Sequence, residues 1–120
     1  KGGNPVDYSP EACPPEFAKA FLNGYGADFV LDYSYDIWSF GMLLFEISTG
    51  KPYFAGKSPS AITKILNIGE FNANLNGVKD AKLRDLIGQC LQSDPKKRPG
   101  IAQILLHPYF VTTGIGPFSF

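Results

Sequence analysis

The stretch SYDIWSFGMLLFEIST, residues 34–49, decides the fold of this 120-residue chain. Apolar residues would cover every face of a helix here: Ile37, Trp38, Phe40, Met42, Leu43, Leu44, Phe45 and Ile47. A helix that is apolar all round belongs inside a protein, so the stretch predicts a buried central helix. Gly50 suits the C-cap of that helix, and Pro52 cannot continue it.

Shorter helices are predicted on both sides of this stretch. A short helix is predicted over residues 15–21, because Pro15 suits its first turn, and Ser58 with Pro59 suits the start of a third helix. Its inner face would hold Ile62, Ile65 and Leu66, and residues 69–77 form a loop. We therefore expect a mainly α fold of about five helices, in which the others pack around the buried central helix.

The last two helices carry clear signals. Asp80 can cap a fourth helix, whose apolar residues follow the i, i+3, i+4, i+7, i+8 pattern: Leu83, Leu86, Ile87, Cys90 and Leu91. The final helix begins near Pro99 and ends before Pro108, and it buries Ile101, Ile104 and Leu105. Residues 111–120 form a tail.

Composition excludes several classes of function. The chain is long enough for one domain, and 44% of its residues are hydrophobic. Eleven basic and eleven acidic residues cancel, so no basic stripe points to nucleic acid, and no apolar run is long enough for a membrane. The chain lacks a starting Met and a signal peptide, which suggests a fragment or a processed product. Two cysteines form neither a disulfide framework nor a zinc pattern, so we expect reduced thiols and an intracellular, cytoplasmic location.

Three motifs, in this order, resemble the second half of a protein kinase catalytic domain. They are Cys13-Pro14-Pro15-Glu16, then Asp36-Ile37-Trp38-Ser39-Phe40-Gly41, then Asp94-Pro95-Lys96-Lys97-Arg98-Pro99. The resemblance covers about residues 5–110 and implies the C-terminal, large lobe of a eukaryotic-type kinase, from the end of the activation segment to the last helix. The ending His107-Pro108-Tyr109-Phe110 is more similar to serine/threonine kinases than to tyrosine kinases. By itself, His107 would be a structural residue in the last turn of a helix, where an imidazolium suits the dipole.

The resemblance implies structural roles for four residues: Glu16, Asp36, Trp38 and Arg98. From chemistry alone, Asp36 could simply cap its own helix, and Glu16 and Arg98 could be ordinary surface charges. In kinases the matching aspartate binds backbone N–H groups of the catalytic loop, and the matching glutamate and arginine form an ion pair. We therefore predict that Glu16 and Arg98 pair, since the planar guanidinium can grip a carboxylate with two bonds. Trp38 is expected in the core.

Residues 1–14 hold three prolines and two glycines and form a loop. By resemblance this loop is the end of the activation segment and receives a substrate peptide through its second half: Ser9, Pro10, Ala12, Cys13 and Pro14. Tyr8 and Ser9 are candidate phosphorylation sites, and an unmodified loop remains the alternative.

The chain departs from the kinase pattern in two places. Residues 22–33 are longer than the usual link into the central helix. Gly100 stands where Thr or Ser is common after Arg-Pro, which weakens the expected cap of the last helix.

Phosphoryl transfer by a kinase needs a Gly-rich loop, a lysine–glutamate pair, a catalytic-loop Asp and Asn, and a metal-binding Asp before Phe-Gly. The sequence contains none of these. We therefore expect the C-terminal part of a serine/threonine kinase that docks substrate and supports the fold. ATP and Mg²⁺ would bind only to an intact kinase domain, and no cofactor or metal is expected here.

Expected partners are a protein or peptide substrate and the missing N-terminal half of the kinase domain, with no nucleic acid and no membrane. A truncated or pseudokinase-derived binding module is the alternative, and an unrelated helical interaction domain is a third interpretation. In each case a central helix with so few neighbours should expose apolar surface, which predicts marginal stability or self-association.

Overall fold

A computed structural model describes residues 14–22, 33–67 and 71–113. These residues form six α-helices and one 3₁₀ helix: α1 Pro15–Leu22, α2 Tyr33–Thr49, α3 Pro59–Asn67, α4 Ala81–Cys90, η2 Pro95–Lys97, α5 Ile101–Leu105 and α6 Pro108–Thr113. None of the described residues lies in a strand. The predicted mainly α fold is confirmed, with one more α-helix than the sequence suggested.

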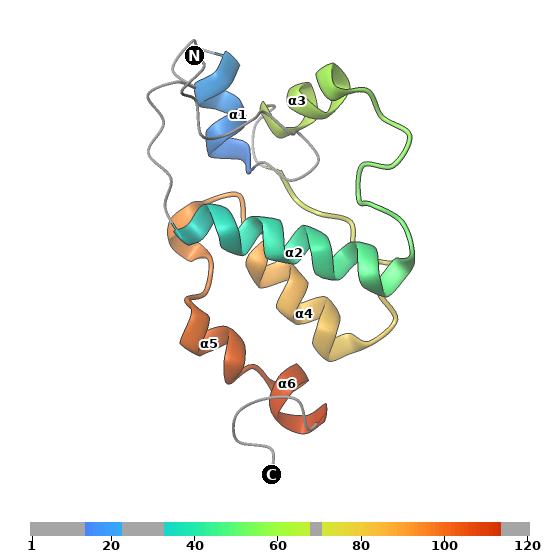
Figure 1. Ribbon diagram of the computed structural model, residues 1–120, viewed down its shortest axis with the longest axis vertical. Helices are drawn as coiled ribbons and strands as arrows, with labels where there is room; N and C mark the ends of the chain where they lie inside the picture. Colours follow the sequence, from blue (N-terminus) through green and yellow to red (C-terminus); the bar gives the residue numbers. More distant parts are fainter. Residues whose placement is uncertain (1–13, 23–32, 68–70, 114–120) are drawn as a thin grey trace.

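Helix α2 crosses the middle of the molecule, and α4 runs along it, while α1 and α3 lie side by side at one end (Figure 1). Gly41 lets α2 and α4 approach closely, because a Cβ atom at this position would lie 2.8 Å from Cβ of Cys90 and 2.9 Å from Cδ2 of Leu91. Such distances are shorter than any ordinary van der Waals contact. The glycine therefore sets the distance between the two longest helices.

The burial of α2 differs from the prediction. Its N-terminal half is buried as expected, through Ile37, Trp38 and Met42. In its C-terminal half, however, Leu43 is 52% exposed and Ile47 is 70% exposed. The prediction of burial on every face is therefore wrong for this half. The physical reason is that the described helices cover only part of the circumference of α2, which agrees with the expected exposure of apolar surface.

Helices α3 and α4 begin where the sequence predicted them. The Oγ atom of Ser58 accepts the N–H of Ala61 at 3.2 Å. Oδ1 of Asp80 accepts the N–H groups of Lys82 and Leu83 at 2.8 and 3.1 Å. These bonds satisfy backbone donors that have no partner within a helix. All five apolar residues predicted for the fourth helix are buried.

The C-terminal end differs most from the sequence prediction. Only Ile104 of the three predicted inner residues is buried, whereas Ile101 and Leu105 are exposed. The chain also continues into α6 after Pro108, because the Nδ1 atom of His107 accepts the N–H of Tyr109 at 3.0 Å and so caps a new helix.

His107 therefore lies in the link between α5 and α6, where it caps the N-terminus of α6, and not in the last turn of a helix as predicted. Its Nδ1 atom accepts a hydrogen bond, so in the neutral ring Nε2 carries the proton and donates it to Oδ2 of Asp85 at 2.8 Å. The weak cap expected at Gly100 is observed, because Gly100 supplies no side-chain hydrogen bond to the first turn of α5. Its own N–H donates to Oε1 of Gln103 at 2.7 Å. The bond between His107 and Asp85 joins the link between α5 and α6 to α4.

None of the helices formed by the described residues has both the length and the apolar character needed to cross a membrane.

Candidate functional site

Arg98 and Glu16 form a bidentate ion pair across 82 positions of sequence. Nη1 of Arg98 donates to Oε2 of Glu16 at 2.7 Å, and Nη2 donates to Oε1 at 2.8 Å. Two parallel bonds between a guanidinium and a carboxylate are the strongest geometry available to such a pair. The pairing predicted from the sequence is therefore present, and it joins the start of α1 to the segment before α5.

The remaining donors of Arg98 bond to backbone carbonyl groups. Nη1 also donates to the oxygen of Ser34 at 3.0 Å, Nε to that of Gln92 at 2.8 Å, and Nη2 to that of Ser93 at 3.4 Å. All five N–H donors of the guanidinium are thus used. Because the Arg98 residue is only 5% exposed, this complete set is what makes its burial tolerable. We call Arg98, its carboxylate partner and these carbonyl groups the anchor.

Trp38 packs against the anchor. Its side chain is fully buried, and the guanidinium carbon of Arg98 lies 5.0 Å from the centre of its ring. That distance permits a cation–π interaction. Phe71 covers another part of the indole, with ring centres 5.6 Å apart. The core position predicted for Trp38 is therefore observed, and the ring covers one face of the buried guanidinium.

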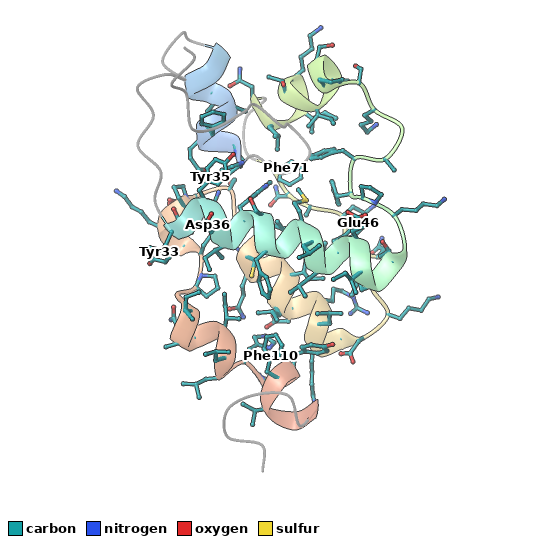
Figure 2. All side chains as sticks on the ribbon, viewed as in Figure 1. Tyr33, Tyr35, Asp36, Glu46, Phe71 and Phe110 are labelled. Carbon is teal, nitrogen blue, oxygen red and sulfur yellow. The ribbon has the colours of Figure 1, made fainter. Side chains whose placement is uncertain are left out.

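Asp36 lies in the first turn of α2, near Tyr33 (Figure 2). Its carboxylate is exposed and lines a pocket of about 390 Å³, whose other walls are apolar and include Phe40, Ile104 and Phe110. A carboxylate in the first turn is favoured by the helix dipole. The structure therefore places Asp36 at the mouth of an apolar pocket between α2 and the two C-terminal helices, with no side-chain hydrogen bond found to it within the described parts of the chain.

Most of the predicted peptide-docking residues, namely Ser9, Pro10, Ala12 and Cys13, lie outside the described residues, as do the candidate phosphorylation sites Tyr8 and Ser9. Pro14 is described and buried. Its carbonyl oxygen accepts the N–H groups of Phe17 and Ala18, both at 3.1 Å. These bonds fix the point where residues 1–14 join α1, directly beside Glu16.

Cys90 is buried between α4 and α2 and is not disulfide-bonded. Burial raises the pKa of its thiol to about 12, although the positive charge of Arg98 offsets part of this rise. A thiol that stays protonated at neutral pH is a poor nucleophile and a poor metal ligand. Cys90 is therefore a core residue. No group of His, Cys, Asp and Glu side chains in the described ranges is arranged to hold a metal ion.

The sequence did not indicate two parts of this arrangement. The carbonyl acceptors of Ser34, Gln92 and Ser93 were missed because every residue has a carbonyl group and its direction is set by the fold. The pocket beside Asp36 was missed because Ile101 and Leu105 fit the pattern of a buried helix face. The helix that carries Ile101 and Leu105 is only five residues long, and so short a helix can cover little of the surface of α2.

Comparison with known proteins agrees with this geometry. The family model described as "Protein kinase domain" matches residues 9–110. A serine/threonine-protein kinase, fray2, from Dictyostelium discoideum is 37% identical over 83 residues, which is 66% of this chain and 8% of that protein. Calcium-dependent protein kinase 3 from Plasmodium yoelii yoelii is 37% identical over 82 residues, 66% of this chain and 15% of the relative.

A third relative, the dual specificity mitogen-activated protein kinase kinase mek-1 from Caenorhabditis elegans, is 38% identical over 77 residues, 63% of this chain and 22% of its own length. The chain thus spans less than a quarter of each of these relatives. The family match covers most of the chain, and it includes both halves of the Glu16–Arg98 pair and the helix that begins with Tyr33. The chain belongs to the protein kinase domain family.

Proposed function

We propose that this chain is the substrate-docking and scaffolding part of a serine/threonine protein kinase. The observation that carries the proposal is the anchor, which ties residues 14–16 to α2 and to the segment before α5 through a buried guanidinium. In the family, the segment before the paired glutamate receives the substrate peptide. A rigid anchor at this point would hold the docking segment at a fixed position on the helical body.

The whole kinase would transfer the γ-phosphate of Mg·ATP to a hydroxyl group of a protein. The residues that bind nucleotide and metal, and the catalytic base, belong to sequence motifs that this chain does not contain. We therefore propose that the chain alone binds neither ATP nor Mg²⁺ and has no kinase activity. The two thiols in its sequence, one of them a buried core residue, favour an intracellular location for the whole protein.

The partner that completes the site would pack on what we call the open face, which consists of apolar residues on α2 and α5: Phe40, Leu43, Ile47, Ile101 and Leu105. The three residues on α2 are spaced by three and four positions and so share one side of the helix. An exposed apolar area of this kind usually marks an interaction site. We propose that the N-terminal half of the kinase domain covers it, and that Asp36 then accepts backbone N–H groups of the catalytic loop.

A kinase-derived scaffold without catalysis is the second candidate. The same folded helices and the same anchor would serve it, since none of the described contacts needs nucleotide. It differs in what precedes Lys1, because a scaffold does not require a catalytic-loop Asp or an Asp-Phe-Gly motif.

The test begins with the coding sequence upstream of Lys1 and with the protein that it encodes. The proposal expects an Asp with an Asn five positions later, an Asp-Phe-Gly, and transfer of ³²P from Mg·ATP to casein by the whole protein. Asp36→Ala should then lower kcat far more than the matched change Asp94→Ala, because Asp94 caps only η2. An upstream half without those residues, or no transfer at all, overturns the kinase proposal in favour of the scaffold. Calorimetry that finds micromolar Mg·ATP binding to the present chain would contradict the assignment of nucleotide binding to the other half.

A further inference from the structure

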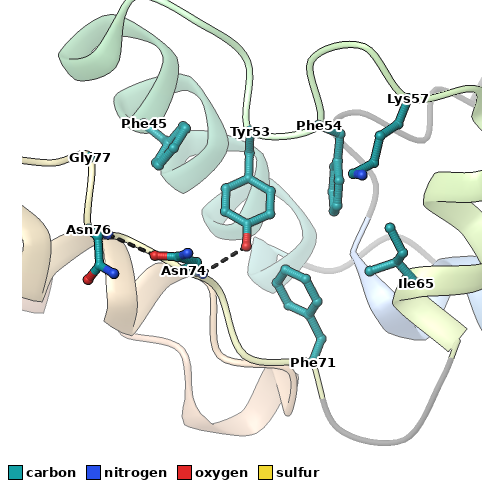
Figure 3. A pocket seen from close by; sticks show the side chains of 9 residues that line it. All are labelled: Phe45, Tyr53, Phe54, Lys57, Ile65, Phe71, Asn74, Asn76 and Gly77. Atoms are coloured by element: carbon teal, nitrogen blue, oxygen red, sulfur yellow. Dashed lines mark hydrogen bonds between the residues drawn. The ribbon is translucent and has the colours of Figure 1, made fainter.

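A second pocket shares no lining residue with the one beside Asp36. It has a volume of about 370 Å³ and lies among the C-terminal half of α2, the loop that follows it, α3, and the segment 71–77 (Figure 3). This volume falls at the lower end of the range of ligand sites in proteins. The anchor uses none of the side chains that line it, so burial of the ion pair does not explain the pocket.

Four aromatic rings line the pocket, namely those of Phe45, Tyr53, Phe54 and Phe71. Tyr53 stands in the middle, with ring centres 5.1 Å from Phe45, 4.8 Å from Phe54 and 5.8 Å from Phe71, each in an edge-to-face arrangement. Phe54 and Phe71 are themselves buried, so the wall is fixed from behind. Edge-to-face clusters readily accept another ring, because its edge or face finds the opposite charge of the neighbouring quadrupole.

The polar groups of the pocket favour a ligand that accepts hydrogen bonds. The Tyr53 hydroxyl already accepts the N–H of Asn74 at 2.8 Å, which leaves its own proton to donate. Among the described residues of the lining, Lys57 alone is charged, and its side chain is exposed at the edge. These described lining residues include no carboxylate, thiol or imidazole, so they suit neither a metal nor a ligand cation.

A ligand that carries an aromatic ring next to an anionic group therefore matches the aromatic wall and Lys57. Asn74 and Asn76, both exposed, add side-chain amides along the segment without regular structure that borders the pocket. Amides can bond to the N–H and C=O groups of a peptide backbone, which a small aromatic acid does not offer. We propose that this pocket binds a partner peptide in which an aromatic side chain is followed by a carboxylate, with the ring against Tyr53 and the carboxylate on Lys57.

The proposal goes beyond kinase function and does not depend on it, because neither nucleotide nor the open face takes part. The probe is a blocked, fluorescein-labelled peptide with Phe-Asp in a Gly/Ser background, and its Kd is measured by fluorescence polarisation. Changing Phe to Ala, or Asp to Asn, should each weaken binding about tenfold, as loss of a buried ring or a charge-assisted bond does. Higher salt should also weaken binding through the carboxylate.

Charge reversal separates Lys57 from general electrostatics. Lys57→Glu should weaken the Phe-Asp peptide by at least about tenfold and should strengthen a Phe-Lys peptide. Lys79→Glu is the matched control, since Lys79 is equally an exposed lysine of the described chain but does not line the pocket. Circular dichroism shows whether each variant keeps its helices.

Three results would overturn the proposal. The Ala-Asp peptide could bind as tightly as Phe-Asp, the Lys79→Glu control could lose as much affinity as Lys57→Glu, or 3-phenylpropionate alone could bind as tightly as the peptide. The last result would assign the pocket to small aromatic acids.

Discussion

The anchor and the open face have opposite relations between polarity and burial. At the anchor, a charged guanidinium is buried and every one of its donors has a partner in the chain. At the open face, apolar side chains such as Ile47 and Ile101 lie exposed, at 70% and 61%. The chain therefore completes its costly polar network by itself but leaves apolar surface uncovered. The anchor therefore serves the internal architecture, whereas the open face is the surface on which we propose that a partner packs.

The largest effect is expected from breaking the anchor. Arg98→Ala leaves the Glu16 carboxylate partly buried without its partner and strips the bonds from three carbonyl groups, so the free energy of unfolding should fall by about 3–5 kcal/mol. Urea denaturation followed by circular dichroism measures the loss. Glu16→Ala and the double mutant complete a cycle, and purely additive losses would show that the two side chains do not interact.

The next effect tests the close contact between α2 and α4. Gly41→Ala places a methyl group 2.8 Å from Cβ of Cys90 and should lower the free energy of unfolding by about 1–3 kcal/mol. Gly88→Ala is the matched control in α4, because its new methyl group would lie at an ordinary contact distance of 3.5 Å from Cδ1 of Leu75. Alanine also has a higher helix propensity than glycine. Equal effects of the two changes would contradict the packing argument.

A smaller effect should show that the interior near the anchor is dry. The pKa of Cys90 is raised from 9.0 to about 12 in the folded chain, so the unfolded thiol loses its proton first as the pH rises. Its contribution to stability is complete below pH 9 and is lost as the pH rises toward 12.

The measurement for Cys90 is the difference between wild type and Cys90→Ala in urea denaturation at several pH values. The variant should lose stability less steeply above pH 9, although its absolute stability is lower because of the cavity. Parallel pH profiles would mean that Cys90 titrates normally in the folded state.

The smallest change in stability is expected at the open face. Leu43→Gln with Ile47→Gln should alter the free energy of unfolding by no more than about 0.5 kcal/mol, since both side chains are already exposed. Self-association, followed by sedimentation velocity, should decrease because the apolar area is smaller. Leu106→Gln is the control, as Leu106 is also exposed but lies outside the open face. A wild-type chain that is monomeric and unfolds sharply above about 60 °C would refute the marginal stability predicted for it.

Features that depend on contacts between residues close in sequence could be predicted from local patterns, whereas features that depend on distant residues could not. The starts of α3 and α4 came from the sequence because Ser58 and Asp80 bond to N–H groups two or three residues ahead. The buried face of α4 could be predicted because its apolar residues repeat with the period of an α-helix. The split between α5 and α6 was missed, because His107 was assigned to the end of one helix when its Nδ1 atom starts the next. Its Nε2 atom bonds Asp85, 22 residues away, which no local pattern indicates.

The sequence alone determined the helices up to α4, the caps of α3 and α4, the absence of nucleotide-binding and catalytic motifs, and, through the resemblance to kinases, the pairing of Glu16 with Arg98. The tertiary structure decided which face of α2 is covered, which backbone carbonyl groups complete the set around Arg98, and where the two pockets lie. The physical reason is the range of the forces. Caps and periodicity act over a few residues, whereas burial and the direction of a carbonyl group depend on segments that meet only when the chain folds.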